Sequence, residues 1–159
     1  VGKGDPVRLT SGKIVVATAG ARVLGVFEGY RVIESDGSVS YDQYYASGSK
    51  AGAVELTAFV YDDPNIAYLI QADDDTTPLP TTGAAVNRNV DLLSRVAPNA
   101  NTKQSKMEVD ASSLTSAVAQ FRILGLFKDP DNTWAGGNET VEVRINEHQW
   151  GVTGITGES

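Results

Sequence analysis

The acidic run DPDNT at residues 129–133 has the residue types of a calcium-binding loop. Asp129, Asp131 and Thr133 would supply the first, third and fifth positions of such a loop, which need oxygen ligands. The sixth position requires Gly for a sharp bend and the twelfth requires Glu, but the chain has Trp134 and Thr140 there. The pattern therefore favours a turn, in which proline fixes the backbone and a side-chain oxygen caps local N–H groups.

Two other acidic runs carry weaker signals. Asp62-Asp63-Pro64-Asn65 repeats the same turn chemistry after another apolar strand. Asp73, Asp74 and Asp75 are consecutive, so their carboxylates converge on one ion only if a folded loop surrounds them, and such runs are usually solvated. We therefore predict no metal ion and no cofactor, with a calcium site at residues 73–75 as a weak alternative.

Catalytic chemistry has few residues to use. His148 is the only histidine, and no G-x-S-x-G elbow supplies a nucleophile for it. The lack of Cys removes thiolate catalysis, disulfides and Cys-ligated zinc. Carboxylate pairs for glycoside hydrolysis stay open because Asp and Glu are plentiful, but Trp134 and Trp150 are the only tryptophans for a sugar cleft. We predict no catalytic residues and a protein that is not an enzyme; His148 is expected in a partly buried or interface position.

Charge and hydropathy limit the partners. Thirteen basic and 20 acidic side chains give a formal net charge of -7, which argues against binding to nucleic acid or to an anionic membrane and suits docking on a basic surface. The apolar runs are too short to span a bilayer. Tyr41, Tyr44 and Tyr45 form the densest aromatic patch. Their role is either hairpin packing or contact with a sugar or a protein.

Alternating apolar residues dominate the chain and predict short strands bounded by turn residues. We predict one all-β domain over residues 1–150, an antiparallel β-sandwich or barrel-like domain with long polar loops and little helix. The segment VNRNVDLL is ambiguous, and we favour strand or irregular structure there. Residues 73–87 and 96–105 are expected to be exposed loops, and 151–159 a flexible C-terminal tail. Strands are predicted around residues 7–9, 14–16, 23–27, 30–32, 39–41, 54–60, 66–72, 106–109, 117–127 and 139–148.

One strand sequence occurs twice. RVLGVF at residues 22–27 returns as RILGLF at residues 122–127, with Gly25 and Gly125 at the same place. The flanking sequences do not match, so we interpret the two copies as a shared solution to one packing problem. A Gly inside a buried strand would allow a neighbouring backbone to approach closely.

Residues 4–149 resemble a family of small structural proteins of tailed bacteriophages. The resemblance rests on the GDPV start, the VYDDP turn and the INEH ending, which are fairly specific as a set. Members are encoded near the major capsid protein and act as head decoration, or cement, proteins. In such relatives a further segment commonly precedes the GDPV strand, so the resemblance implies an N-terminal arm upstream of Val1, where this chain has no initiator Met.

The resemblance implies a protein on the outer surface of the virion capsid that bridges and stabilises neighbouring major capsid protein subunits. It implies a homo-oligomer, with a trimer favoured and a dimer as the alternative. The rival function is a virion fibre, spike or adhesin domain that binds host surface glycans. Because polar loops reach outward from β scaffolds, we expect capsid contacts from the 73–85 loop, the 98–105 loop and the tail. The residues expected to make them are Asp73, Asp74, Asp75, Pro78, Pro80, Asn99, Asn101, Lys103 and Trp150.

Overall fold

The protein folds into two antiparallel sheets in a sandwich-like arrangement, and its described residues contain no α-helix. The structure is a computed structural model of the whole chain and describes residues 1–73, 78–93, 96–151 and 154–158. The predicted all-β class with little helix is therefore confirmed. The elements are β1 (Pro6–Thr10), β2 (Lys13–Val16), β3 (Gly25–Ile33), β4 (Val39–Asp42), β5 (Glu55–Tyr61), β6 (Ala67–Gln71), β7 (Asn89–Val90), a 3₁₀ turn η1 (Ala111–Ser113), β8 (Phe121–Leu126) and β9 (Thr140–Ile145).

The first sheet has the order β2-β1-β3-β4, and β5 pairs with the other edge of β3. Ser11 and Gly12 turn β1 into β2 with positive φ angles, as the turn residues predict. The hairpin predicted at Asp36-Gly37 is also present: Gly37 has a φ of 83°, and the Asp36 carboxylate accepts a hydrogen bond from Ser38 N at 2.9 Å. The predicted strands at 23–27 and 30–32 are joined in the single nine-residue strand β3.

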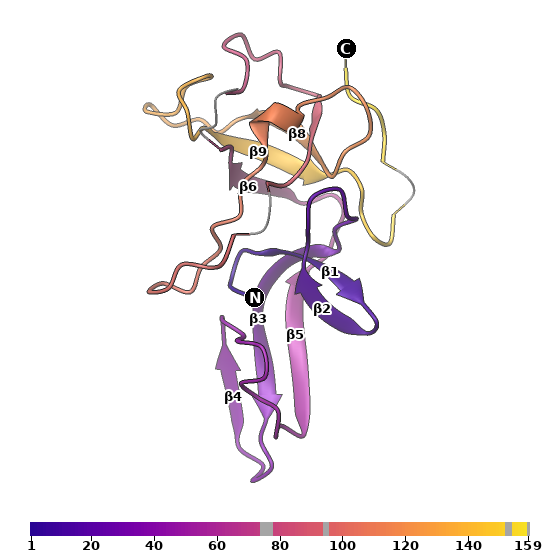
Figure 1. Cartoon of the computed structure of the whole chain (residues 1–159), viewed down its shortest axis with the longest axis vertical. Coiled ribbons are helices and arrows are strands. Elements are labelled where there is room, and N and C mark those ends of the chain that lie inside the picture. Colours follow the sequence, from indigo (N-terminus) through magenta and orange to yellow (C-terminus); the bar gives the residue numbers. More distant parts are fainter. Residues whose placement is uncertain (74–77, 94–95, 152–153, 159) are drawn as a thin grey trace.

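The distal part of this sheet projects away from the rest of the molecule (Figure 1). We call β4, β5 and the part of β3 between them, residues 29–33, the β-arm. A small core of Val7, Phe27, Tyr30 and Val32 begins at β1 and the start of β3 and extends onto one face of the β-arm. The Tyr45 ring covers this core by packing edge-on against Tyr30 at 5.6 Å between ring centres.

The second sheet has the order β6-β9-β8-β7 and forms one wall of the larger core. β9 alternates as its sequence predicts, with Val141, Val143 and Ile145 all buried. The segments between β6 and β8 contribute further apolar side chains to this core, among them Leu79 and Leu92, and the chain around the end of β2 contributes Val16, Ala17 and Val23. VNRNVDLL forms only the two-residue strand β7 and a bridge at Leu92, in agreement with strand or irregular structure.

Two glutamine side chains join the first sheet to the segments around the second. The Gln149 amide pairs with β1 like a piece of backbone: its Oε1 accepts from Leu9 N and its Nε2 donates to Leu9 O, both at 2.7 Å. Gln120 is fully buried, accepts from Leu92 N at 2.9 Å and donates to the carbonyl oxygens of Thr18 and Ala21. Side-chain amides that bond to backbone groups on both sides in this way fix the relative position of the elements they join.

The two glycines of the repeated strand have different environments. A Cβ on Gly25 would lie 2.0 Å from the carbonyl oxygen of Tyr61, so the predicted close backbone approach is present there. A Cβ on Gly125 would meet nothing within 4 Å, and the strand has a register shift between Ile123 and Gly125 instead. The single packing explanation is therefore wrong for the second copy, where Gly marks an irregularity in the β8–β9 pairing.

The loop after β6 is not uniformly exposed, contrary to prediction. Leu79 and Ala85 are fully buried in the larger core. Asp73 is only 6% exposed, and its carboxylate accepts a hydrogen bond from Ala111 N at 2.7 Å. Although this segment is rich in polar residues and Pro, it therefore buries two apolar side chains and one carboxylate.

The C-terminal residues 154–158 also differ from a free tail. Gly157 N donates to Ser116 O at 2.8 Å, and Glu158 N donates to Asn87 O at 3.1 Å. A Cβ on Gly157 would lie 2.8 Å from the Cα of Arg88, so only a glycine fits this approach. Backbone hydrogen bonds thus hold this segment beside β7.

Candidate binding surface

The acidic run at residues 129–133 is a structural turn between β8 and β9. The Asp129 carboxylate accepts a hydrogen bond from Asp131 N, as in other Asx turns. Asn132 closes the loop, because its Nδ2 donates to the carbonyls of Phe127 and Thr140 and its Oδ1 accepts from Thr140 N. Asp63 caps Asn65 in the same way at 2.8 Å. The turn interpretation is confirmed at both places.

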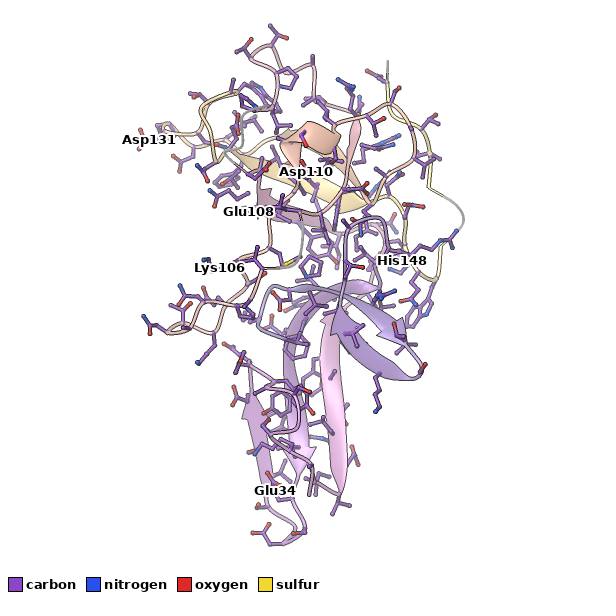
Figure 2. All side chains as sticks on the ribbon, in the orientation of Figure 1. Glu34, Lys106, Glu108, Asp110, Asp131 and His148 are labelled. Atoms are coloured by element: carbon purple, nitrogen blue, oxygen red, sulfur yellow. The ribbon has the colours of Figure 1, made fainter. Side chains whose placement is uncertain are left out.

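The acidic side chains and His148 form no candidate metal site in the described parts of the chain. Figure 2 shows Glu34, Asp131 and His148 in separate regions of the molecule. In these parts, no three His, Asp or Glu side chains come close enough together to hold a metal ion. His148 is 4% exposed, its Nδ1 accepts from Trp150 N at 3.2 Å, and its ring lies edge-on to the Trp150 ring. It is a packing residue beside the bridge that pairs it with Val23.

The predicted contact residues fall in different environments. Asn99, Asn101 and Lys103 share one tight loop, in which the Asn99 carbonyl and side chain accept hydrogen bonds from the backbone of residues 101–103. The Lys103 ammonium lies 5.1 Å from the centre of the Tyr44 ring, a cation–π contact. Trp150 is 65% exposed.

The remaining predicted contacts are less uniform. Pro78 is exposed and Pro80 is half-buried. Asp73 is buried, so its side chain serves the fold and is not offered to a partner. Asp74 and Asp75 lie outside the described residues.

The strongest surface feature is an apolar and aromatic face on the β-arm. Val39, Tyr41, Phe59 and Tyr61 lie on one side of the three strands, because the cross-strand register places Tyr41 beside Arg31 and Phe59 beside Gly29. All four are 43–70% exposed. The Tyr41 and Phe59 rings are stacked at 6.4 Å with 14° between their planes. They border a groove of about 470 Å³ whose other walls include Glu28, Asp42 and Gln43.

The opposite side of β5 is also exposed. Leu56 is 45% exposed and Ala58 is exposed, because the small core on this side lies over β3 and extends only to Val60 at the proximal end of β5. Val54, just before the strand, is 74% exposed. β5 therefore presents apolar side chains to solvent on both faces, which is unusual for a strand of a monomeric protein.

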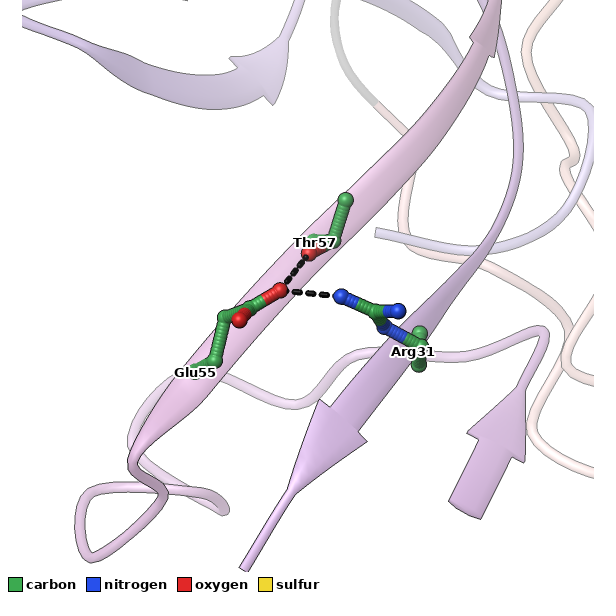
Figure 3. A network of polar contacts seen from close by, with 3 residues as sticks. All are labelled: Arg31, Glu55 and Thr57. Carbon is green, nitrogen blue, oxygen red and sulfur yellow. Dashed lines mark hydrogen bonds and ion pairs between the residues drawn. The ribbon is translucent and has the colours of Figure 1, made fainter. Parts of the chain in front are cut away.

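The one charged side chain of β5 is already neutralised. Glu55 accepts hydrogen bonds from the Thr57 hydroxyl at 2.8 Å and from the Arg31 guanidinium of β3 (Figure 3). The bond from Thr57, followed by the bond and charge of Arg31, lowers the pKa of the Glu55 carboxyl. The strand thus carries no free charge that would repel an apolar partner.

No family model, no curated protein and no solved structure matches this chain. No described helix is long and apolar enough to cross a membrane. The sequence did not predict the exposed β-arm. ELTAFVY has apolar residues on both sides of the strand: Leu56, Ala58 and Val60 lie on one side, and Phe59 and Tyr61 lie on the other. Apolar residues at both odd and even positions of a strand predict that both of its faces are buried, but both faces of β5 are exposed.

Proposed function

We propose that this protein works by binding other protein subunits, as a decoration protein on the outer surface of a tailed-bacteriophage capsid. The observation that carries a binding role is the β-arm, which displays Tyr41, Phe59 and Tyr61 on an acidic protein. Exposed aromatic patches of this kind mark protein interaction sites, because their burial releases much apolar surface from water. The capsid assignment is supported by the resemblance in the GDPV, VYDDP and INEH segments.

The proposed mechanism is linkage between binding and assembly. A protein that binds the assembled shell across subunit boundaries, but not the separated subunits, stabilises the shell in proportion to its occupancy and affinity. No catalytic group is needed for this. The net charge of -7 suits a basic docking surface, and several copies held in one homo-oligomer would add their contacts through multivalency. The major capsid protein is the proposed partner.

Reconstitution on capsids tests the proposal. Particles that lack the protein should lose thermal and osmotic stability and regain both when the purified chain is added. A Tyr41→Asp/Phe59→Asp double variant should restore less stability, while an exposed control such as Ser116→Asp should behave like the unmodified protein. Deficient particles that are as stable as complete ones would refute the cement function.

The groove beside Tyr41 favours a second candidate, an adhesin domain that binds host glycans. Stacked aromatic rings next to the Asp42 and Glu28 carboxylates and the Gln43 amide are a combination that suits a sugar ring, with apolar contact on one side and hydroxyl partners on the other. A glycan array with the isolated protein tests this. Binding that is lost in Tyr41→Ala would favour the adhesin, and no binding to any glycan would remove it.

A further inference from the structure

The free edge of β5 is the best candidate on this molecule for pairing with another strand. Within the described residues β5 pairs only with β3, so the backbone N–H and C=O groups of its other edge have no strand partner. Its seven residues, ELTAFVY, contain no Pro, Gly or Lys. Proteins normally protect an edge strand with such residues, with a bulge or with a covering loop, because an open edge recruits other strands.

The other edges near it are protected. β4 is short, four residues, and carries Asp42. The end of β6 is paired with Val109, whose N donates to Gln71 O at 3.0 Å and whose carbonyl accepts from Asp73 N at 3.1 Å. β5 is therefore distinguished by its length, its unpaired edge and its lack of uncompensated charge, and the β1–β2 residues Gly12, Lys13 and Ile14 line a cleft with Leu56, Thr57 and Ala58.

The sequence of β5 is complementary to itself in the antiparallel direction. If two copies pair around a twofold axis at Ala58, Leu56 of one copy lies opposite Val60 of the other, and Thr57 lies opposite Phe59. This register pairs all seven residues and places Glu55 opposite Tyr61, so no like charges meet. A shift of the axis to Phe59 would bring Leu56 opposite Asp62 and Glu55 opposite Asp63, which is unfavourable.

We propose that the β5 edges of two copies of this chain pair antiparallel around Ala58 and form a twofold dimer. The two β-arms then form one continuous six-stranded sheet, β4-β3-β5-β5-β3-β4, and the apolar residues on both sides of β5 gain neighbours on the same face. The β-arm projects from the molecule (Figure 1), so the start of β5 lies away from the second sheet. The dimer is independent of the proposed capsid function, and it selects the twofold oligomer over the trimer.

Charge pairs at the twofold axis give the sharpest test. Ala58 is exposed, so Ala58→Lys and Ala58→Glu should leave the monomer folded, which a thermal melt verifies. In light scattering after gel filtration, the unmodified protein should have twice the 16.8 kDa mass of the chain. Each variant alone should be a monomer, because two like charges then face each other. An equimolar mixture of the two should recover the dimer.

Single cysteines test the register. The chain has no Cys, so Ala58→Cys introduces one thiol per copy, and residues opposite each other across antiparallel strands have Cβ atoms close enough for a disulfide. Oxidised Ala58→Cys should run as a cross-linked dimer, whereas Val39→Cys on β4 should not. An unmodified protein that is a monomer or a trimer, variants at position 58 that keep its mass, or preferential cross-linking at position 39 would each overturn the proposal.

Discussion

At the scale of single residues, two glycines in nearly identical sequences should respond differently to the same substitution. Gly25→Ala forces a Cβ to within 2.0 Å of the Tyr61 carbonyl oxygen, so we expect a loss of about 3 kcal/mol in the free energy of unfolding. Gly125→Ala meets open space, so its effect should stay within about 0.5 kcal/mol. Urea unfolding of both variants measures the difference, and similar losses would contradict the assigned environments.

Gln120 provides a second residue-level prediction. Gln120→Ala removes an amide that is fully buried, and it leaves Leu92 N without an acceptor and the carbonyls of Thr18 and Ala21 without this donor. Since each unsatisfied buried group costs about 1–3 kcal/mol, we expect a total loss of about 3 kcal/mol in urea unfolding. The matched control is Gln104→Ala at an exposed position, which should change stability by less than about 0.5 kcal/mol. A Gln120 variant as stable as the control would show that water replaces the amide.

At the scale of elements, alternation predicted most of the strands because one buried face leaves a clear period, but the strand predicted around residues 106–109 is wrong, since that segment has only an isolated bridge at Val109. β9 is the clearest case, with Val141, Val143 and Ile145 buried in sequence order. The hairpin pairings β1–β2 and β3–β4 followed from their turn residues, but pairings between strands distant in the chain, and the exposure of each strand, could not be predicted. The strand predicted at residues 54–60 is exposed on both faces, while the loop after β6, predicted to be exposed, buries Leu79. For the same reason, the sequence predicted contacts in the polar loops, whereas the strongest surface feature of the structure is on the β-arm.

The link between β5 and β6 should make stability depend on alkaline pH. The Tyr68 hydroxyl of β6 donates to the Tyr61 carbonyl at 2.9 Å. Burial, with smaller contributions from Asp63 and Asp62, raises the pKa of Tyr68 to about 12. The folded protein therefore holds this proton more tightly than the unfolded chain, where a tyrosine pKa is about 10. The resulting stabilisation is complete below about pH 10 and is lost as the pH rises through 12.

Tyr68→Phe separates this effect from the titration of other groups. The variant lacks the ionisable hydroxyl, so its free energy of unfolding should fall less steeply between pH 10 and 12 than that of the unmodified protein. Lysines and the other tyrosines titrate in both proteins and cancel in the difference. Parallel stability curves over this range would contradict the raised pKa.

At the scale of the whole molecule, the two sheets have different tasks. The second sheet, with its larger core, and the hydrogen-bonded amides of buried Gln120 and half-buried Gln149 make a rigid base. The β-arm has only a small core on one side and leaves its edge and both faces of β5 open. A stable base with an exposed apolar projection is typical of a protein that buries this apolar surface by binding, either to a second copy or to another subunit.

If the dimer and the capsid function are both correct, self-pairing should strengthen capsid binding. A dimer offers two copies of each capsid-binding surface, and linking two sites typically raises apparent affinity by about 10²–10⁴-fold. We therefore expect Ala58→Lys to bind deficient particles at least about 100-fold more weakly in a cosedimentation assay, and Ala58→Glu to do the same despite its opposite charge. Mixing the two variants should restore binding, which controls for charge effects on the shell. If either variant alone bound as tightly as the unmodified protein, the capsid contacts would not depend on the dimer, and each chain would act on the shell by itself.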